Sequence, residues 1–164
     1  MSFTLTHDDV SPALSRLAAT ARNPIKVFRA MGNKFKAITE GTFNSAGASF
    51  RPTPWAPKRD GTPSNLQMST TLSKAFHLEV TASYAKLSNA TIYAAIHQFG
   101  GVIRPKGKAL VWTDANGQKH FAKKVTIPAR PFFPVVAGQL TAAAAKLIAA
   151  AGERAIARDA AGIA

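Results

Sequence analysis

The N-terminal quarter of the chain carries apolar residues at intervals of three and four, which is the spacing of one helix face. A short first helix is predicted after Asp8 and Asp9, either of which can serve as its N-cap. Asn23-Pro24 separates it from a second helix, because Asn caps well and Pro is tolerated in the first turn. This second helix is predicted from Pro24 to about Phe43. Its buried stripe would consist of Val27, Phe28, Met31, Phe35, Ile38 and Thr42.

The segment from Ser45 to Ser64 is rich in proline and glycine, which exclude a helix or a central strand. It is therefore predicted to be a loop, exposed and able to reach neighbouring molecules. Trp55 stands in its middle. A tryptophan in such a place usually pins the loop to the core, and contact with a partner is the alternative. A short helix around Leu72 is predicted to follow.

Beyond this helix the apolar period changes to two, which indicates strands. His77–Leu87 alternates between apolar and polar residues and is predicted to be one half-buried strand. Ile92–Phe99 is apolar and fits either a strand end or one helical turn. Asn116-Gly117 is the strongest hairpin signal in the chain and joins the last two of the remaining strands. Those predicted strands are Val102–Arg104, Leu110–Thr113 and Lys119–Ile127.

Prolines at positions 128, 131 and 134 end the strand pattern. An alanine-rich helix is predicted from about Val135 to Ala157, because alanine has the highest helix propensity. The order of elements predicts an α+β fold, with N-terminal helices, an antiparallel β-sheet and a long C-terminal helix. Residues 1–164 are expected to form a single domain, because no linker or internal repeat interrupts them.

Charge is the compositional outlier: 21 Lys and Arg against 8 Asp and Glu give a net charge of +13. The bases concentrate in two segments, Arg22–Arg59 and Arg104–Arg130, whose only acids are Glu40 and Asp114. Such a field attracts polyanions such as nucleic acid or an acidic protein surface. The alternative is a solvated surface that keeps the protein soluble. An acidic partner, or DNA passing by, is the favoured interpretation.

Several kinds of chemistry have no candidate residues. The chain has no cysteine, which excludes a disulfide, a thiolate metal site and a cysteine nucleophile. Its four histidines are far apart, its acids are scattered, and no phosphate loop, dinucleotide fingerprint or nucleophile elbow occurs. We therefore expect no catalytic residue, metal or cofactor, and no enzymatic activity. No leader segment is visible, and Ala142–Ala151 is too short to span a bilayer, so no membrane partner is expected.

Two sequence motifs remain as candidates for a structural or interface role. The first is Ile92–Gly101, in which Tyr93 and Phe99 are predicted to be large packing groups. Its last two residues, Gly100-Gly101, permit a turn with positive φ. His97 is interpreted as a hydrogen-bonded structural histidine rather than a proton shuttle.

The second motif is Ile127–Phe133, in which prolines on both sides of Ala129-Arg130 favour an extended segment. Arg130 could clamp a carboxylate or backbone carbonyls inside the subunit, or bridge to a neighbouring subunit, and the internal role is favoured. Phe132 would enter the core.

The basic loop Arg104–Lys108 is predicted to be exposed and to reach neighbours. The candidate interface or structural residues are Trp55, Tyr93, His97, Phe99, Gly100, Gly101, Arg104, Lys106, Lys108, Arg130 and Phe132.

Together with Leu66–Leu72, these motifs resemble the phage virion-morphogenesis, or tail-completion, family of Mu-like phages. The resemblance covers Trp55–Phe133 and departs from the family at Thr70-Thr71, where a glycine usually precedes the second leucine. It implies a structural protein of a tailed bacteriophage, part of the neck or of the tail-completion or tail-terminator ring that joins the tail to the DNA-filled head. A ring of identical copies, expected to be hexameric, is implied by the axial symmetry of the particle. Its implied partners are other neck and tail proteins and DNA passing through the channel. Its implied location is the virion neck, after assembly in the host cytoplasm.

Two other functions compete with this one. A non-sequence-specific nucleic-acid-binding protein would account for the charge, but the basic segments lack the interleaved aromatic residues of a single-strand binder. A small cell-wall hydrolase would need a pair of acids, and only Asp8 and Asp9 are adjacent.

Overall fold

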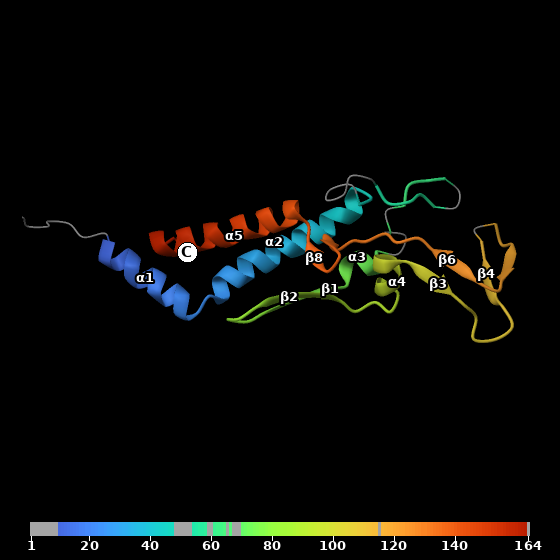
Figure 1. Cartoon of the computed structure of the whole chain (residues 1–164), viewed down its shortest axis with the longest axis horizontal. Helices are drawn as coiled ribbons and strands as arrows, with labels where there is room; N and C mark the ends of the chain where they lie inside the picture. The colour runs from blue at the N-terminus through green and yellow to red at the C-terminus, as the bar shows by residue number, and fades with distance from the viewer. Residues whose placement is uncertain are drawn as a thin grey trace, which may run out of the picture. The chain divides into compact units, whose positions relative to one another are not determined.

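Figure 1 shows the computed structural model of the chain, which describes residues 10–47, 54–58, 61–64, 66, 70–114 and 116–163. Contacts divide the chain into two compact units. The helical unit comprises Met1–Thr39, Phe76–Asn89 and Val136–Ala164, and the hairpin unit comprises Glu40–Ala75 and Ala90–Val135. Each unit has buried residues of its own. The predicted caps Asp8 and Asp9 lie outside the described residues.

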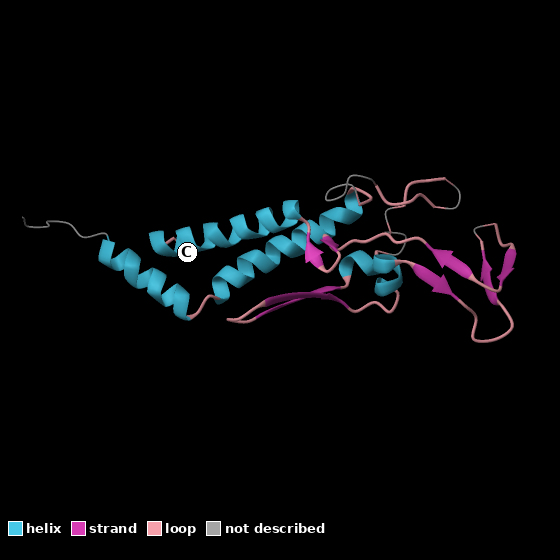
Figure 2. Cartoon of the chain, viewed as in Figure 1, coloured by secondary structure: helices cyan, strands magenta, loops and turns pink. Residues whose placement is uncertain are grey.

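The described elements are helices and short strands (Figure 2). The helices are α1 (Val10–Arg22), α2 (Ile25–Asn44), α3 (Thr71–Lys74), α4 (Ala94–Phe99) and α5 (Ala142–Ala161). The strands are β1 (Phe76–Val80), β2 (Ala85–Asn89), β3 (Gly101–Ile103), β4 (Leu110–Thr113), β5 (Lys119–Ala122), β6 (Val125–Ile127), β7 (Val135–Val136) and β8 (Gln139–Leu140). They pair as β1–β2, β3–β6, β4–β5 and β7–β8, and the first three pairs are antiparallel. The α+β class predicted from the sequence is confirmed.

Glycines set the closest approaches in the helical unit. A Cβ on Gly32 would lie 2.9 Å from Cδ1 of Leu78, so the β1–β2 hairpin packs directly on the α2 backbone. A Cβ on Gly152 would lie 3.0 Å from Sδ of Met31, where α5 meets α2. Helices α1 and α5 also pack together, and Arg16 Nε donates a hydrogen bond to the carbonyl of Ala160 (2.8 Å). Close packing of the helices against one another and against the β1–β2 hairpin therefore holds this unit together.

The hairpin unit has a small aromatic core. Phe43, at the end of α2, is fully buried beside Phe132 and Trp55. Leu72 of α3 is also buried. The strand pairs of this unit are short: Val102 faces Thr126 in β3–β6, and four residue pairs join β4 to β5.

The second helix and the Asn116-Gly117 hairpin are confirmed, because α2 spans Ile25–Asn44 and β4 pairs with β5 around that turn. Of the two alternatives for Ile92–Phe99, the structure has the helical turn, α4. No helix in the described part of the chain has the length and apolarity needed to cross a bilayer.

The prediction of one strand over His77–Leu87 was wrong, because the segment is a hairpin of β1 and β2. The Thr81 hydroxyl accepts hydrogen bonds from the backbone N–H groups of Ser83 and Tyr84 (both 3.1 Å) and so closes the turn. Lys119–Ile127 is likewise two strands, since β5 pairs with β4 and β6 pairs with β3. The expected single sheet is thus four two-stranded sheets among the described residues.

The predicted start of the last helix at Val135 was also wrong. Ala137 (φ 51°) and Gly138 (φ 81°) have positive φ angles and reverse the chain between β7 and β8. A helix cannot continue through this conformation. Helix α5 begins only at Ala142, where Thr141 caps it by accepting a hydrogen bond from the N–H of Ala144.

Candidate functional site

Arg130 and Trp55 tie the proline-rich loop to the second motif in the hairpin unit. Nε and Nη2 of Arg130 donate to the carbonyls of Ala56 and Pro57, each at 2.9 Å. Trp55 Nε1 donates to the carbonyl of Pro131 at 2.9 Å. Arg130 is only 9% exposed, so these bonds form largely out of water. The structure thus places Arg130 in the internal role and Trp55 in the pinning role.

Gln98 joins the two motifs, and the sequence reasoning missed it. Its side-chain oxygen accepts hydrogen bonds from the N–H groups of Phe132 and Phe133, each at 3.0 Å. The N–H of Arg130 in turn donates to the carbonyl of His97 at 2.7 Å. The available signal was an uncharged polar residue inside an apolar segment, because a buried amide requires partners.

Three aromatic rings fill the space behind these hydrogen bonds. The ring of Phe43 stacks on that of Phe132 with centroids 5.6 Å apart. It meets the ring of Trp55 edge to face at 5.7 Å. Both geometries are favourable for aromatic pairs. Phe132, Trp55 and Arg130 therefore belong to one buried cluster that fixes the fold of the hairpin unit.

Gly100 and Gly101 have positive φ angles of 70° and 153°. A Cβ on Gly100 would lie 2.8 Å from the backbone nitrogen of Ala129, so only glycine fits where the first motif passes the second. This contact brings the two motifs, which are separated in sequence, together in the fold.

Two expectations for the first motif were wrong. Phe99 is 78% exposed and is not a packing group, because α4 turns this side chain to solvent while Gln98 faces the core. Nδ1 of His97 is buried without a hydrogen-bond partner among the described residues, so this histidine is not the satisfied one expected. Burial, and then the nearby Arg130 charge, lowers the pKa of His97 below the ordinary 6.5. Tyr93 packs edge to face against the His97 ring (5.9 Å).

The β4–β5 hairpin has two partly exposed faces, and Trp112 on the first of them is 38% exposed. On the first, the rings of Trp112 and His120 stack 5.4 Å apart, and His120 Nε2 lies 2.9 Å from Asp114 Oδ2. The hydrogen bond from His120 lowers the pKa of the Asp114 carboxyl. On the second, Val111 and Phe121 face each other across the strands and are 56% and 68% exposed. An isolated two-stranded hairpin is marginal in water, and this one carries an exposed apolar pair.

Basic residues lie close to this hairpin along the chain. Arg104, Lys106 and Lys108 are all exposed in the connection between β3 and β4. Val102, at the preceding strand, is also largely exposed. The exposed apolar pair together with these three bases is called the hairpin surface below. Of the residues predicted from the sequence, Arg104, Lys106 and Lys108 belong to it, whereas Trp55, Arg130 and Phe132 belong to the buried cluster.

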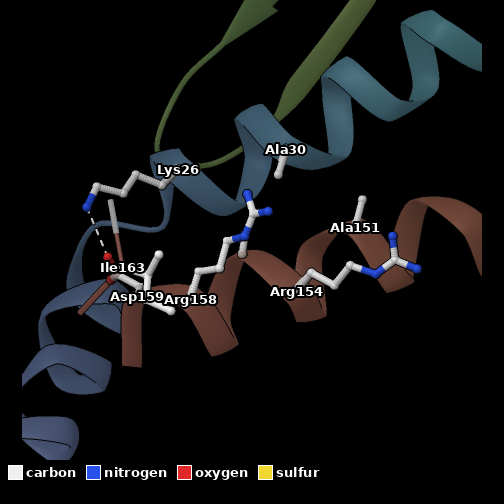
Figure 3. A pocket seen from close by; sticks show the side chains of 8 residues that line it. Lys26, Ala30, Ala151, Arg154, Arg158, Asp159 and Ile163 are labelled. Atoms are coloured by element: carbon white, nitrogen blue, oxygen red, sulfur yellow. Dashed lines mark hydrogen bonds and ion pairs between the residues drawn. The ribbon is translucent and has the colours of Figure 1, made fainter. Parts of the chain in front are cut away.

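A groove of about 510 Å³ lies between α2 and α5 in the helical unit, and the sequence reasoning missed it (Figure 3). Its lining includes Ala30 of α2 and Ala151 of α5, and the side chains of Arg154 and Arg158 extend from α5. Lys26 Nζ is 2.9 Å from Oδ1 of Asp159, whose other oxygen accepts from the Thr20 hydroxyl. These bonds lower the pKa of Asp159, the Thr20 bond contributing most. The i, i+4 spacing of the two arginines was the available signal.

Neither unit gathers a set of side chains suited to metal binding in the part of the chain that the structure describes: no three His, Cys, Asp or Glu residues converge there. The described residues instead form an exposed apolar hairpin with basic neighbours and a groove lined by Lys26, Arg154, Arg158 and Asp159.

The profile of one protein family, described as the phage virion morphogenesis family, matches residues 5–151. This match extends well beyond the Trp55–Phe133 stretch that carries the motifs. No curated protein and no solved structure matches the chain.

Proposed function

Because the chain belongs to the phage virion morphogenesis family, we propose that it is a structural subunit of the neck or tail-completion ring of a tailed bacteriophage. In this role it joins the tail to the DNA-filled head and performs no catalysis. The ring is a closed assembly of identical copies, with six the expected number, and it contacts other neck and tail proteins. The family match carries the virion role, and the exposed apolar pair Val111 and Phe121 on a hairpin of only two strands supports an assembly contact.

The hairpin surface has the chemistry of an assembly contact. Burial of two largely exposed apolar side chains in a contact removes them from water, which stabilises the complex. Two-stranded sheets also leave an outer strand edge on each side, to which another chain can add. The three bases beside the hairpin favour a neighbour whose matching surface is acidic.

The first test replaces the exposed pair. We expect Val111→Thr/Phe121→Thr to keep the thermal melt of the wild type while losing ring formation in mass photometry and head–tail joining in complemented phage. Threonine suits a strand, so the hairpin itself should persist. Leu14→Gln/Ile156→Gln is the control, because it removes two exposed apolar side chains from the helical unit. Rings and joining that survive in the threonine variant would overturn the role of the hairpin surface in assembly, and a wild-type chain that forms no ring and is not required for joining would overturn the proposed function.

The second test reverses the charge of the loop. Lys106→Glu/Lys108→Glu should weaken head–tail joining at low and moderate salt and leave the melt unchanged, because both side chains are exposed. Lys123→Glu/Lys124→Glu, with the same charge change at two other exposed positions of the unit, is the control. Unchanged joining at both salt concentrations would mean that the loop charge is solvated surface. Joining lost with a collapsed melt would mean that the lysines support the fold.

A further inference from the structure

The groove between α2 and α5 is lined by more positive than negative charge (Figure 3). Lys26, Arg154 and Arg158 line it together with a single carboxylate, that of Asp159. This carboxylate already pairs with Lys26 Nζ at 2.9 Å and accepts a hydrogen bond from the Thr20 hydroxyl. The charges of Arg154 and Arg158 therefore remain without a balancing acid in the groove lining.

These two arginines are available for a partner. Both side chains are exposed, and neither guanidinium makes a hydrogen bond or ion pair in the part of the chain that the structure describes. Glu153, the other acid of α5, is absent from the groove lining. An approaching carboxylate would thus meet two cations that have no competing partner within the described residues.

The rest of the groove lining is largely apolar. Ala30 of α2 and Ala151 and Ala155 of α5 contribute short side chains, which allow another chain to approach closely. Ile163 also lines the groove and is 62% exposed. An apolar partner surface would remove these side chains from water, whereas a nucleic-acid backbone has no such surface to offer. The lining therefore favours a protein segment over nucleic acid.

The spacing of residues along α5 indicates what kind of segment fits. Leu147, Ala151, Arg154 and Arg158 follow one another at intervals of four, three and four, which places them on one side of the helix. Leu147 is 42% exposed, so this side offers an apolar contact as well as the two charges. Such spacing is the pattern on which a second helix packs. Arg154 and Arg158 are one turn apart, so they match two carboxylates one turn apart on that helix.

We infer that the α2–α5 groove binds an acidic amphipathic helix of another protein. Its apolar side would pack against Ala30 and Ala151, and its two carboxylates would pair with Arg154 and Arg158. An acidic partner also suits a chain whose net charge is +13. The groove lies within the helical unit, so the inference depends neither on the hairpin surface nor on the ring role.

The test uses the purified full chain and a synthetic peptide of about 20 residues, long enough to form a helix. The peptide carries two glutamates four residues apart beside a stripe of alanine and leucine. A reference peptide has the same composition, with one glutamate moved to the opposite side of the helix. Fluorescence anisotropy should show about tenfold tighter binding of the first peptide. Equal Kd values would mean that only net charge is recognised and would overturn the inference, as would the absence of binding.

Charge reversal in the groove tests the two arginines. Arg154→Glu/Arg158→Glu should raise the Kd of the first peptide at least about tenfold, because like charges would then face each other. Lys123→Glu/Lys124→Glu is the matched control, with the same charge change at exposed positions of the hairpin unit. It should leave the Kd nearly unchanged. Similar losses in the two variants would overturn the inference.

Two further variants guard against a simple loss of folding. A peptide with lysines in place of its two glutamates should bind Arg154→Glu/Arg158→Glu and not the wild type, which an unfolded chain could not do. Ala151→Gln keeps both arginines but places an amide in the apolar lining, so it should weaken binding of the first peptide as well. Failure of both expectations would overturn the inference.

Other occupants of the groove give different results. A fluorescent DNA duplex whose Kd rises in Arg154→Glu/Arg158→Glu, but not in Lys123→Glu/Lys124→Glu, would assign the groove to nucleic acid. Self-association of the wild type that disappears only in the arginine variant, followed by mass photometry without peptide, would assign it to a second copy. Either result would overturn the inference.

The peptide assay also separates this inference from the proposed function. Val111→Thr/Phe121→Thr should bind the first peptide as the wild type does, even where it has lost head–tail joining. A wild-type chain that binds the peptide but forms no ring would overturn the ring proposal and leave the groove standing. Rings that form while the peptide does not bind would overturn the groove alone.

Discussion

In the helical unit, elements approach one another where a glycine removes a side chain, at Gly32 and Gly152, and Gly100 allows a similar approach in the hairpin unit. The hairpin unit adds hydrogen bonds between side chains and backbone groups far away in the sequence, with Arg130 and Trp55 as donors and Gln98 as an acceptor. Regular elements satisfy most of their own backbone groups, so the helical unit relies on shape complementarity and a few side-chain bonds, such as that from Arg16 to the carbonyl of Ala160. Loops leave backbone N–H and carbonyl groups without such partners, so side chains supply the hydrogen bonds in the hairpin unit.

This difference predicts how each unit responds to substitution. Stability in the hairpin unit should depend on a few buried residues, each of which has several partners. Stability in the helical unit should depend on spacing at many points, each with a smaller effect. The four predictions below run from the largest expected effect to the smallest.

Phe132 and Phe99 belong to the neighbouring motifs of one unit but differ completely in burial. Phe132→Ala should lower the free energy of unfolding by about 3–5 kcal/mol, because it leaves a cavity beside Phe43. Phe99→Ala should change it by less than about 0.5 kcal/mol, because its side chain already faces water. Urea unfolding of both variants checks this pair. Similar losses at the two positions would refute the description of the core.

Arg130 makes two buried charge-assisted hydrogen bonds to the proline-rich loop. Arg130→Met should cost about 3 kcal/mol of unfolding free energy, because the carbonyls of Ala56 and Pro57 lose their donor. Arg130→Lys keeps the charge but not the planar fork, so its loss should be smaller but clear. Chemical denaturation measures both. A methionine variant as stable as the wild type would show that the clamp is not what holds the loop.

Gly32 and Gly41 lie in the same helix, and only the first is in close contact. Gly32→Ala should destabilise the chain by about 1–3 kcal/mol, because the new methyl group would overlap Leu78 and Ala85. Gly41→Ala has no atom within 4 Å of the new Cβ and should stabilise the helix by about 0.5–1 kcal/mol. Thermal melts of the two variants should therefore shift in opposite directions. Melting temperatures that shift in the same direction in both variants would contradict the close approach described at Gly32.

His97 gives the hairpin unit a pH dependence. Its pKa is lowered in the fold, so the unfolded chain takes up the proton at the higher pH. The stability due to neutral His97 is complete above the ordinary pKa of 6.5 and is lost as the pH falls through that value toward the folded pKa. His97→Gln should flatten this loss. Unfolding free energies of both proteins between pH 5 and pH 8, about the range in which histidine titrates, measure the difference. Parallel curves of unfolding free energy against pH for the two proteins would contradict the lowering of the His97 pKa by burial.

The sequence predicted best those features that depend on neighbouring residues. The spacing of apolar residues located α2 within a residue or two at each end, and Asn116-Gly117 located the β4–β5 turn. It failed where a turn left the pattern unchanged, as at Thr81–Tyr84, since four turn residues preserve a period of two. It also failed at Ala137-Gly138, where alanine-rich composition favoured a helix but the backbone reverses.

For the candidate sites, the sequence by itself determined the family resemblance, the two motifs and the unusual excess of basic residues. Residue type and local order carry these properties, whatever the chain does elsewhere. Only the tertiary structure decided that Gln98, not Phe99, faces the core, and that Arg130 binds the carbonyls of Ala56 and Pro57. Such pairings depend on how distant segments pack, and packing is set by the whole chain rather than by any short stretch of it.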